Sequence, residues 1–236
     1  GGTVSALSTT VLSCMRASGG SLDVAGAEEA VARALGLEGG GSGLLQEDVV
    51  AALRSGARPA GLWAAPLQQV HIFALLVAVY LTGSDAPLTS FPRQLDAGDL
   101  AFSELGSAIA LLHRTPGATL DLTCNRTVAE LLSRCAVQWQ QVGGRTRRAL
   151  AEEEVLDEEI EAVATSTARL NSYVGDVQEG APEQIEDSLV AWSSYSQTEA
   201  AALVQRLRGA IITSDEYREA TTSEARPILQ PIPVFR

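Results

Sequence analysis

The densest group of basic residues in this sequence follows a glycine pair and precedes a run of carboxylates. Arg145, Arg147 and Arg148 stand at the expected start of a helix. Glycines let a ligand approach the backbone closely, and the free N–H groups at a helix N-terminus bind phosphate. The arrangement predicts a phosphate or RNA-backbone contact, which Arg126 and Arg134 would join if the fold brought them near. The competing interpretation is that these arginines pair with neighbouring glutamates.

The carboxylates that follow the arginines would support acid/base chemistry only if the pKa of one of them were raised above the pKa of another. Enzymes that use paired carboxylates achieve this by placing one of them in an apolar cleft. Here the acidic residues of 152–161 fall mainly opposite a helical stripe formed by Leu150, Ile160, Val163 and Leu170. The spacing therefore predicts a solvated helix face rather than a catalytic pair.

Two histidines and three cysteines are the other residues with catalytic or metal-binding chemistry. His71 lies in the most apolar segment, which predicts a core side chain, and His113 lies near the expected end of a helix. Cys14, Cys124 and Cys135 include no CxxC pair, so they predict reduced thiols rather than a zinc or disulfide framework. No GxSxG, HExxH, phosphate-loop or dinucleotide-binding motif is found. We therefore expect no enzyme activity, no metal and no cofactor.

The net charge and the hydropathy of the sequence limit the classes of partner that the chain could bind. The net charge is −12, which disfavours a broad electrostatic contact with nucleic acid or with an anionic membrane. All 17 basic residues are arginine, a side chain suited to pairing with carboxylates at interfaces. The most apolar stretch, "VHIFALLVAVYLTG", is shorter than the ~20 residues that a transmembrane helix needs. We expect a buried core helix there and no membrane span.

The composition predicts an all-α fold. Hydrophobic residues make up 46% of the 236 residues and aromatic residues only 5%, and alanine and leucine lose little side-chain freedom in a helix. Apolar periodicity, with glycine and proline between the periodic segments, predicts a single bundle of about eight helices in residues 1–213. Apart from a hairpin near 118–124, no sheet is expected. The helices are expected over 3–17, 21–35, 44–54, 66–82, 96–113, 127–142, 145–173, 182–195 and 198–212.

Within this bundle, one helix is expected to form the centre of the core. Pro66 suits the first turn of a helix that runs to about Thr82, with the preceding residues in a loop. The longest apolar run follows it, and we expect the side chains of Leu75, Leu76, Val79 and Tyr80 to be buried.

The last segment, residues 214–236, is expected to form an extended arm. Its three prolines exclude a helix, yet five large apolar side chains lie among them, which is unusual for a solvent-exposed tail. Proline also lowers the entropy lost when a segment is fixed, so the arm suits docking in an extended form. We expect it to contact a neighbouring subunit in a homo-oligomer, although docking on its own domain is the alternative. The contact residues would be Ile228, Leu229, Ile232, Val234 and Phe235.

These features favour a non-enzymatic, self-assembling structural subunit of the viral coat or nucleocapsid type. A helical core with an extended arm resembles helical viral coat proteins at the level of architecture alone. We expect a virion or cytoplasmic location rather than secretion. A second hypothesis is a helical adaptor or regulatory protein that binds a basic partner through the acidic face at 152–161. A third is an enzyme whose site is assembled from dispersed residues.

Overall fold

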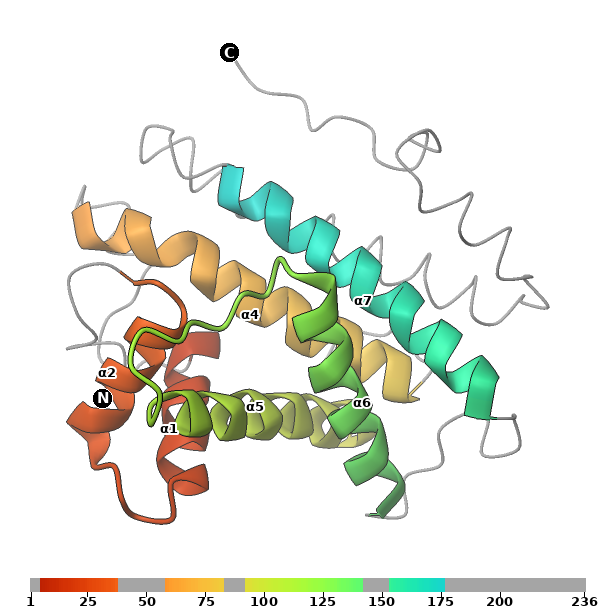
Figure 1. The fold of residues 1–236 in the computed structure, drawn as a ribbon, viewed down its shortest axis with the longest axis horizontal. Helices are drawn as coiled ribbons and strands as arrows, with labels where there is room; N and C mark the ends of the chain where they lie inside the picture. The colour runs from red at the N-terminus through yellow and green to blue at the C-terminus, as the bar shows by residue number, and fades with distance from the viewer. Residues whose placement is uncertain (1–4, 38–57, 83–91, 142–152, 177–236) are drawn as a thin grey trace.

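The computed structural model describes residues 5–37, 58–82, 92–141 and 153–176 (Figure 1). These residues form six α-helices and no strand, which confirms the all-α prediction for this part of the chain. The expected helices at 44–54, 182–195 and 198–212 and the arm at 214–236 lie outside the described residues. The helices are α1 Ala6–Ala17, α2 Val24–Ala34, α4 Arg58–Thr82, α5 Pro92–Leu112, α6 Asn125–Gln141 and α7 Glu153–Asp176.

Helix α4 lies at the centre of the described bundle, in contact with α1, α5, α6 and α7. Helix α1 packs between α2 and α5, and α6 contacts both α5 and α7 (Figure 1). The connection from α5 to α6 passes beside the end of α2, where the Leu120 backbone N–H donates to the Ala34 carbonyl at 2.6 Å. All six helices contribute side chains to one hydrophobic core.

The core prediction for α4 is confirmed. Leu75, Leu76, Val79 and Tyr80 are between 1% and 8% exposed. By length and composition alone, the segment Ala65–Thr82 is also the one described helix that could cross a membrane, and 78% of it is buried inside the protein. A buried core helix meets the same criterion, so this is weak evidence for a span.

The expected start of this helix was wrong. Helix α4 begins at Arg58, eight residues before Pro66, so the segment predicted as a loop is helical and Pro66 lies inside the helix. Proline in a helix interior removes one backbone hydrogen bond at a cost of about 3 kcal/mol. Ala65 is 4% exposed and Pro66 is buried, so tertiary burial offsets this local preference.

The ends of α2 show how local sequence sets helix boundaries. The N-cap is Asp23, two positions after the expected helix start at residue 21, and its carboxylate accepts a hydrogen bond from the Gly26 N–H at 2.8 Å. At the other end Gly36 adopts φ +66°, the left-handed conformation that glycine tolerates best. This lets the Leu37 N–H reach the Ala32 carbonyl at 2.7 Å and close a Schellman motif.

Helices α5 and α6 both begin earlier than predicted. Helix α5 starts at Pro92 instead of at Asp96 or Asp99, because proline suits the first helical position, where no N–H is required. Helix α6 starts at Asn125 instead of after Thr127, and Cys124 occupies the preceding cap position. The described connection 113–124 contains turns and no strand, so the hairpin expected there is absent.

Two large apolar side chains, one in α1 and one in α2, lie on the surface. Leu12 is 41% exposed and Val24 is 45% exposed. In α7, by contrast, Ile160, Val163 and Leu170 are buried and Glu161 is exposed, as the predicted amphipathic pattern requires.

Candidate functional site

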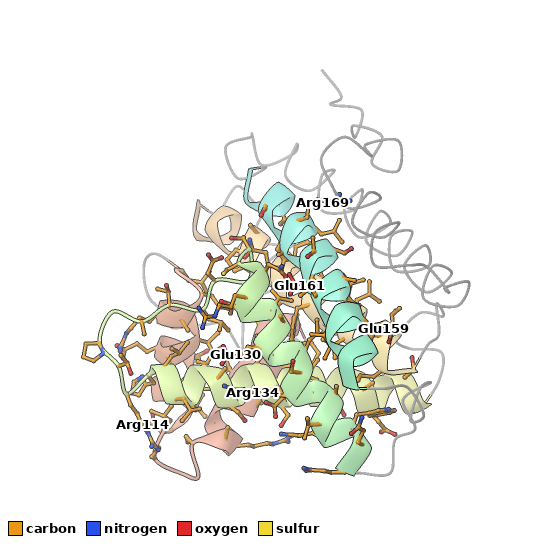
Figure 2. All side chains as sticks on the ribbon, turned by 45° about the vertical axis from the view of Figure 1, so that its right-hand side comes forward. Arg114, Glu130, Arg134, Glu159, Glu161 and Arg169 are labelled. Carbon is orange, nitrogen blue, oxygen red and sulfur yellow. The ribbon has the colours of Figure 1, made fainter. Side chains whose placement is uncertain are left out.

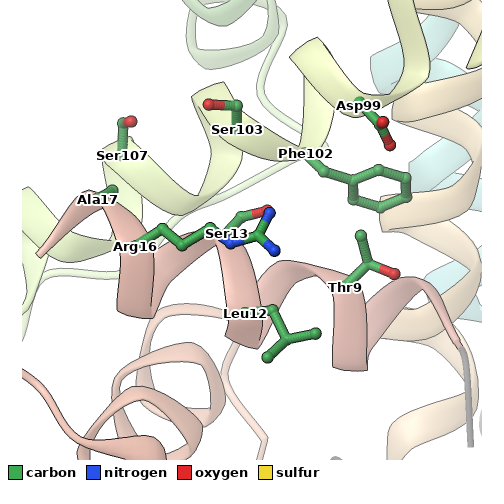
Figure 3. Close-up of a pocket in the computed structure, with 9 residues that line it drawn as sticks. All are labelled: Thr9, Leu12, Ser13, Arg16, Ala17, Asp99, Phe102, Ser103 and Ser107. Atoms are coloured by element: carbon green, nitrogen blue, oxygen red, sulfur yellow. The ribbon is translucent and has the colours of Figure 1, made fainter. Parts of the chain in front are cut away.

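A groove runs along the surface where α1 packs against α5. Its volume is about 490 Å³ and it is open to solvent on one side. Figure 3 shows the side chains that line it, which come from α1 below and α5 above. The lining residues are Thr9, Leu12, Ser13, Arg16, Ala17, Asp99, Phe102, Ser103 and Ser107.

The orientation of α1 follows from its cap and its buried stripe. Ser5 and Ser8 form a reciprocal capping box, in which the Ser8 N–H donates to Ser5 Oγ at 3.1 Å and the Ser5 N–H donates to Ser8 Oγ at 2.7 Å. Leu7, Val11 and Cys14 are at most 1% exposed and fix the inward face of the helix. The opposite side of α1 is therefore left to form one wall of the groove.

The other wall lies close to α1 because α5 has a glycine at the contact. A β-carbon added to Gly106 would collide with the backbone carbonyl carbon of Ser13 and lie 2.6 Å from the Cys14 nitrogen. Ser103 and Ser107, the neighbours of Gly106 on the groove side, are small as well. Small residues at this spacing let two helix backbones approach closely, so the groove is narrow at its floor.

The chemistry of the lining suits binding better than catalysis. Thr9 Oγ1 donates to the Ser5 carbonyl at 2.9 Å, while the hydroxyls of Ser13, Ser103 and Ser107 form no hydrogen bond within the described part of the chain. A hydroxyl becomes a nucleophile when a neighbouring base takes its proton. Among the lining residues the candidate base is Asp99, a solvent-exposed carboxylate with no histidine beside it.

The groove is amphipathic along its length. Leu12 is 41% exposed and Phe102 is half-buried, so both offer apolar surface. Arg16 extends from one end of the groove, beside Ala17, and Asp99 lies at the other end (Figure 3). No motif or charge pattern in the sequence predicted this site. Four small residues in α5, Ser103, Gly106, Ser107 and Ala110, were the available signal of a close helix contact.

Two of the five arginines predicted to bind phosphate lie in the described residues. Arg126 and Arg134 are both exposed on α6, eight residues and therefore about 12 Å of helix apart. The guanidinium of Arg134 pairs with Glu130 at 3.7 Å, the local pairing that was the competing interpretation (Figure 2). The other three, Arg145, Arg147 and Arg148, lie outside the described residues.

The acidic face predicted at 152–161 is described at its C-terminal end. Glu161 is exposed, and its carboxylate accepts a hydrogen bond from Asn125 Nδ2 at 2.8 Å (Figure 2). This contact joins the start of α6 to α7. The side chains before Glu159 lie outside the described residues, so the extent of the face stays a prediction.

A buried carboxylate that the sequence analysis did not single out lies between α5 and α6. Glu104 is 3% exposed and accepts a hydrogen bond from Gln138 Nε2. Burial raises the pKa of Glu104, and the positive charge of Arg134 opposes this shift. The negative charge of Glu104 in turn adds to the effect of burial in raising the pKa of Cys135.

The three thiols are free, and they differ in environment. Burial raises the pKa of Cys14 to about 11. Cys124 is half-buried at the start of α6, where hydrogen bonds from the backbone and hydroxyl of Thr127 and the backbone of Arg126 lower its pKa. His71 on α4 is half-buried rather than fully buried, and burial lowers the pKa of its ring, which favours the neutral form.

The described residues contain no group of three or more histidine, cysteine, aspartate and glutamate side chains that could hold a metal ion. The apolar side chains of the predicted arm lie outside the described residues. Comparison of the chain with protein-family models, with curated proteins and with solved structures found no match.

Proposed function

We propose that this chain is a non-enzymatic structural subunit that assembles with copies of itself, of the viral coat or nucleocapsid type. The observation that best supports the proposal is the α1–α5 groove, an open amphipathic surface with an exposed leucine between an arginine and an aspartate. A contact of this composition fits a protein partner.

The shape of the groove favours a protein partner over a small-molecule ligand. Pockets for small ligands bury most of the ligand surface and are lined mainly by apolar and aromatic groups around a few convergent polar groups. The α1–α5 groove is open along one side, its two charges lie apart, and Phe102 is the one aromatic side chain among the described residues that line it. An extended protein surface matches that layout better than a compact ligand does.

The C-terminal arm is the second element of the proposal. Burying apolar side chains such as Ile228, Ile232 and Phe235 on a neighbour is worth roughly 1.5–3 kcal/mol each before the loss of chain entropy. Such an arm would add to the affinity between subunits without altering the helical core.

Nucleic acid contact is a further proposal for an assembled coat. With a net charge of −12, the chain would bind a phosphate backbone only at a local group of arginines. Arg126 and Arg134 are exposed, which is compatible with this role, but Arg134 already has Glu130 as a partner. The group would therefore depend mainly on Arg145, Arg147 and Arg148.

The size of the full chain in solution, measured at low and high salt, tests the proposal. A structural subunit should form species larger than a dimer as its concentration rises. An adaptor that binds a basic partner through the acidic face should stay a monomer or dimer under the same conditions, which would favour that alternative.

A further inference from the structure

The two charged residues of the α1–α5 groove are left without a partner inside the described chain. Arg16 and Asp99 are both exposed, and neither forms an ion pair with another described residue. Figure 3 places Asp99 beside Phe102 at one end of the groove, whereas the Arg16 side chain starts near Ala17 at the opposite end and its guanidinium reaches back beside Ser13. The groove thus has a negative charge at one end and a separate positive charge nearer its middle.

Two apolar side chains, one from each helix, flank the groove. Leu12 is 41% exposed on the α1 wall, in the turn between Thr9 and Arg16. Phe102 lies on the α5 wall and packs partly against the core. The hydroxyls of Ser13, Ser103 and Ser107, which form no hydrogen bond within the described residues, also line the groove. Such a surface offers an apolar contact with hydrogen-bond donors and acceptors around it.

A surface with two separated, opposite charges is complementary to a copy of itself turned by 180°. In a two-fold contact, residue i of one subunit meets residue j of the other, and residue j meets residue i. We infer that the α1–α5 groove is a two-fold contact between copies of this chain, in which Arg16 of each copy pairs with Asp99 of the other. This inference rests on the proposed self-assembly and names the surface that carries it.

A second copy fits these features better than a different protein does. A basic or an acidic partner would match one of the two charges of the groove and be repelled by the other. The nine lining residues are fewer than the 20–30 residues per side of a stable interface, so the contact is expected to be weak alone and to act with others in an assembly.

Complementary charge reversals test the inference in the full chain. Arg16→Asp places two pairs of aspartates across the contact, and Asp99→Arg places two pairs of arginines there. Each variant alone should therefore associate at least about tenfold more weakly than the parent, because like charges that face each other across an interface are strongly unfavourable. An equimolar mixture of the two variants restores both opposite-charge pairs in the mixed dimer, and so should the double variant.

Sedimentation velocity with one variant fluorescently labelled gives the readout, because mixed complexes then carry the label. Arg114→Asp, the same charge change at an exposed position outside the groove, serves as the control and should associate like the parent. Recovery of association in the mixture also shows that both variants are folded, since misfolded chains would not complement each other.

The inference is wrong if the two single variants associate like the parent, or if their mixture associates no better than either variant alone. In both cases assembly of the parent would stand, and only the groove would lose its role. A parent chain that stays monomeric at every concentration would instead overturn the proposed self-assembly and the groove contact together.

Discussion

Gly106 on α5 faces the backbone of Ser13 on α1 with no space for a β-carbon between them. An added methyl group would collide with the Ser13 carbonyl carbon, and it would also lie 2.6 Å from the nitrogen of Cys14. Because both obstacles are backbone atoms, a side-chain rotation cannot relieve the collision. The close approach of the two helices, and with it the floor of the groove, depends on this glycine.

Gly106→Ala should therefore destabilise the fold by about 1–3 kcal/mol, the usual range for overpacking, although alanine is the better helix former. Urea unfolding followed by circular dichroism measures the change. Gly26→Ala in α2 is the matched control, because its nearest neighbour is a side-chain atom, Asp23 Oδ1 at 3.1 Å. The control should change stability by less than about 1 kcal/mol. A Gly106→Ala variant as stable as the parent would show that α1 and α5 are not in tight contact.

Because α4 is the buried central helix, shortening one of its core side chains should cause the largest loss of folding stability. Leu76 is 1% exposed, and Leu76→Ala should cost about 2–5 kcal/mol through lost burial and the cavity that remains. Leu111 on α5 is 57% exposed, so Leu111→Ala should change stability by less than about 0.5 kcal/mol. Reversible denaturation of both variants gives the comparison. Equal effects would mean that α4 is not the central helix of the core.

The three thiols should react in a fixed order. The thiolate is the reactive form, so the lowered pKa of Cys124 raises its reactive fraction near pH 8, whereas Cys14 with a pKa of about 11 is almost fully protonated there. Pulsed iodoacetamide labelling read by mass spectrometry should modify Cys124 first and the buried Cys14 and Cys135 only on unfolding. Thr127→Val removes the hydroxyl donor and should shift the labelling profile of Cys124 to higher pH. Faster labelling of Cys14 in the native protein would contradict this account.

The buried Glu104 should make stability depend on pH in a defined direction. Its folded-state pKa is raised, so the folded protein binds a proton more tightly than the unfolded chain does. The stabilisation from this proton is present at low pH and is lost as the pH rises from the ordinary glutamate pKa of about 4.3 through the raised value. Glu104→Gln keeps an acceptor for Gln138 and removes the charge. The variant should therefore gain stability relative to the parent near pH 7, and the gain should shrink below about pH 4.

Glu130→Gln, at an exposed position on α6, is the control for that experiment and should show a much smaller pH-dependent difference. Stability curves from pH 3 to pH 8 provide the test. If Glu104→Gln were less stable than the parent at neutral pH and equal to it at acidic pH, the sign of the shift would be wrong.

The helices were predictable where local sequence and burial agree. The apolar run in α4 predicted Leu75, Leu76 and Val79 as core residues, and the glycines after Leu35 predicted the end of α2. Pro66 was misinterpreted because a proline usually marks a helix start, whereas here burial of the surrounding helix outweighs that preference. Asp96 and Thr127 were likewise interpreted as helix starts. The two helices begin earlier, at Pro92 and at Asn125.

The spacing of apolar residues along the sequence could not predict the groove. It exists because Gly106 meets Ser13, a residue 93 positions earlier in the chain (106 minus 13), and that pairing depends on how α1 and α5 pack. Periodicity places Leu12 on the apolar stripe of α1, but the stripe is wider than the surface that α5 and α2 cover. Leu12 therefore stays exposed at the edge of the groove.

Sedimentation velocity of the full chain over a wide concentration range, beside a variant that lacks residues 226–236, tests the proposed self-assembly most directly. The account predicts that the full chain forms species larger than a dimer as concentration rises. It also predicts that the truncated chain keeps its helical circular dichroism and shifts toward smaller species. A full chain that sediments as a monomer at every concentration and salt condition would contradict self-assembly, and a truncated chain that assembles like the parent would remove the arm from it.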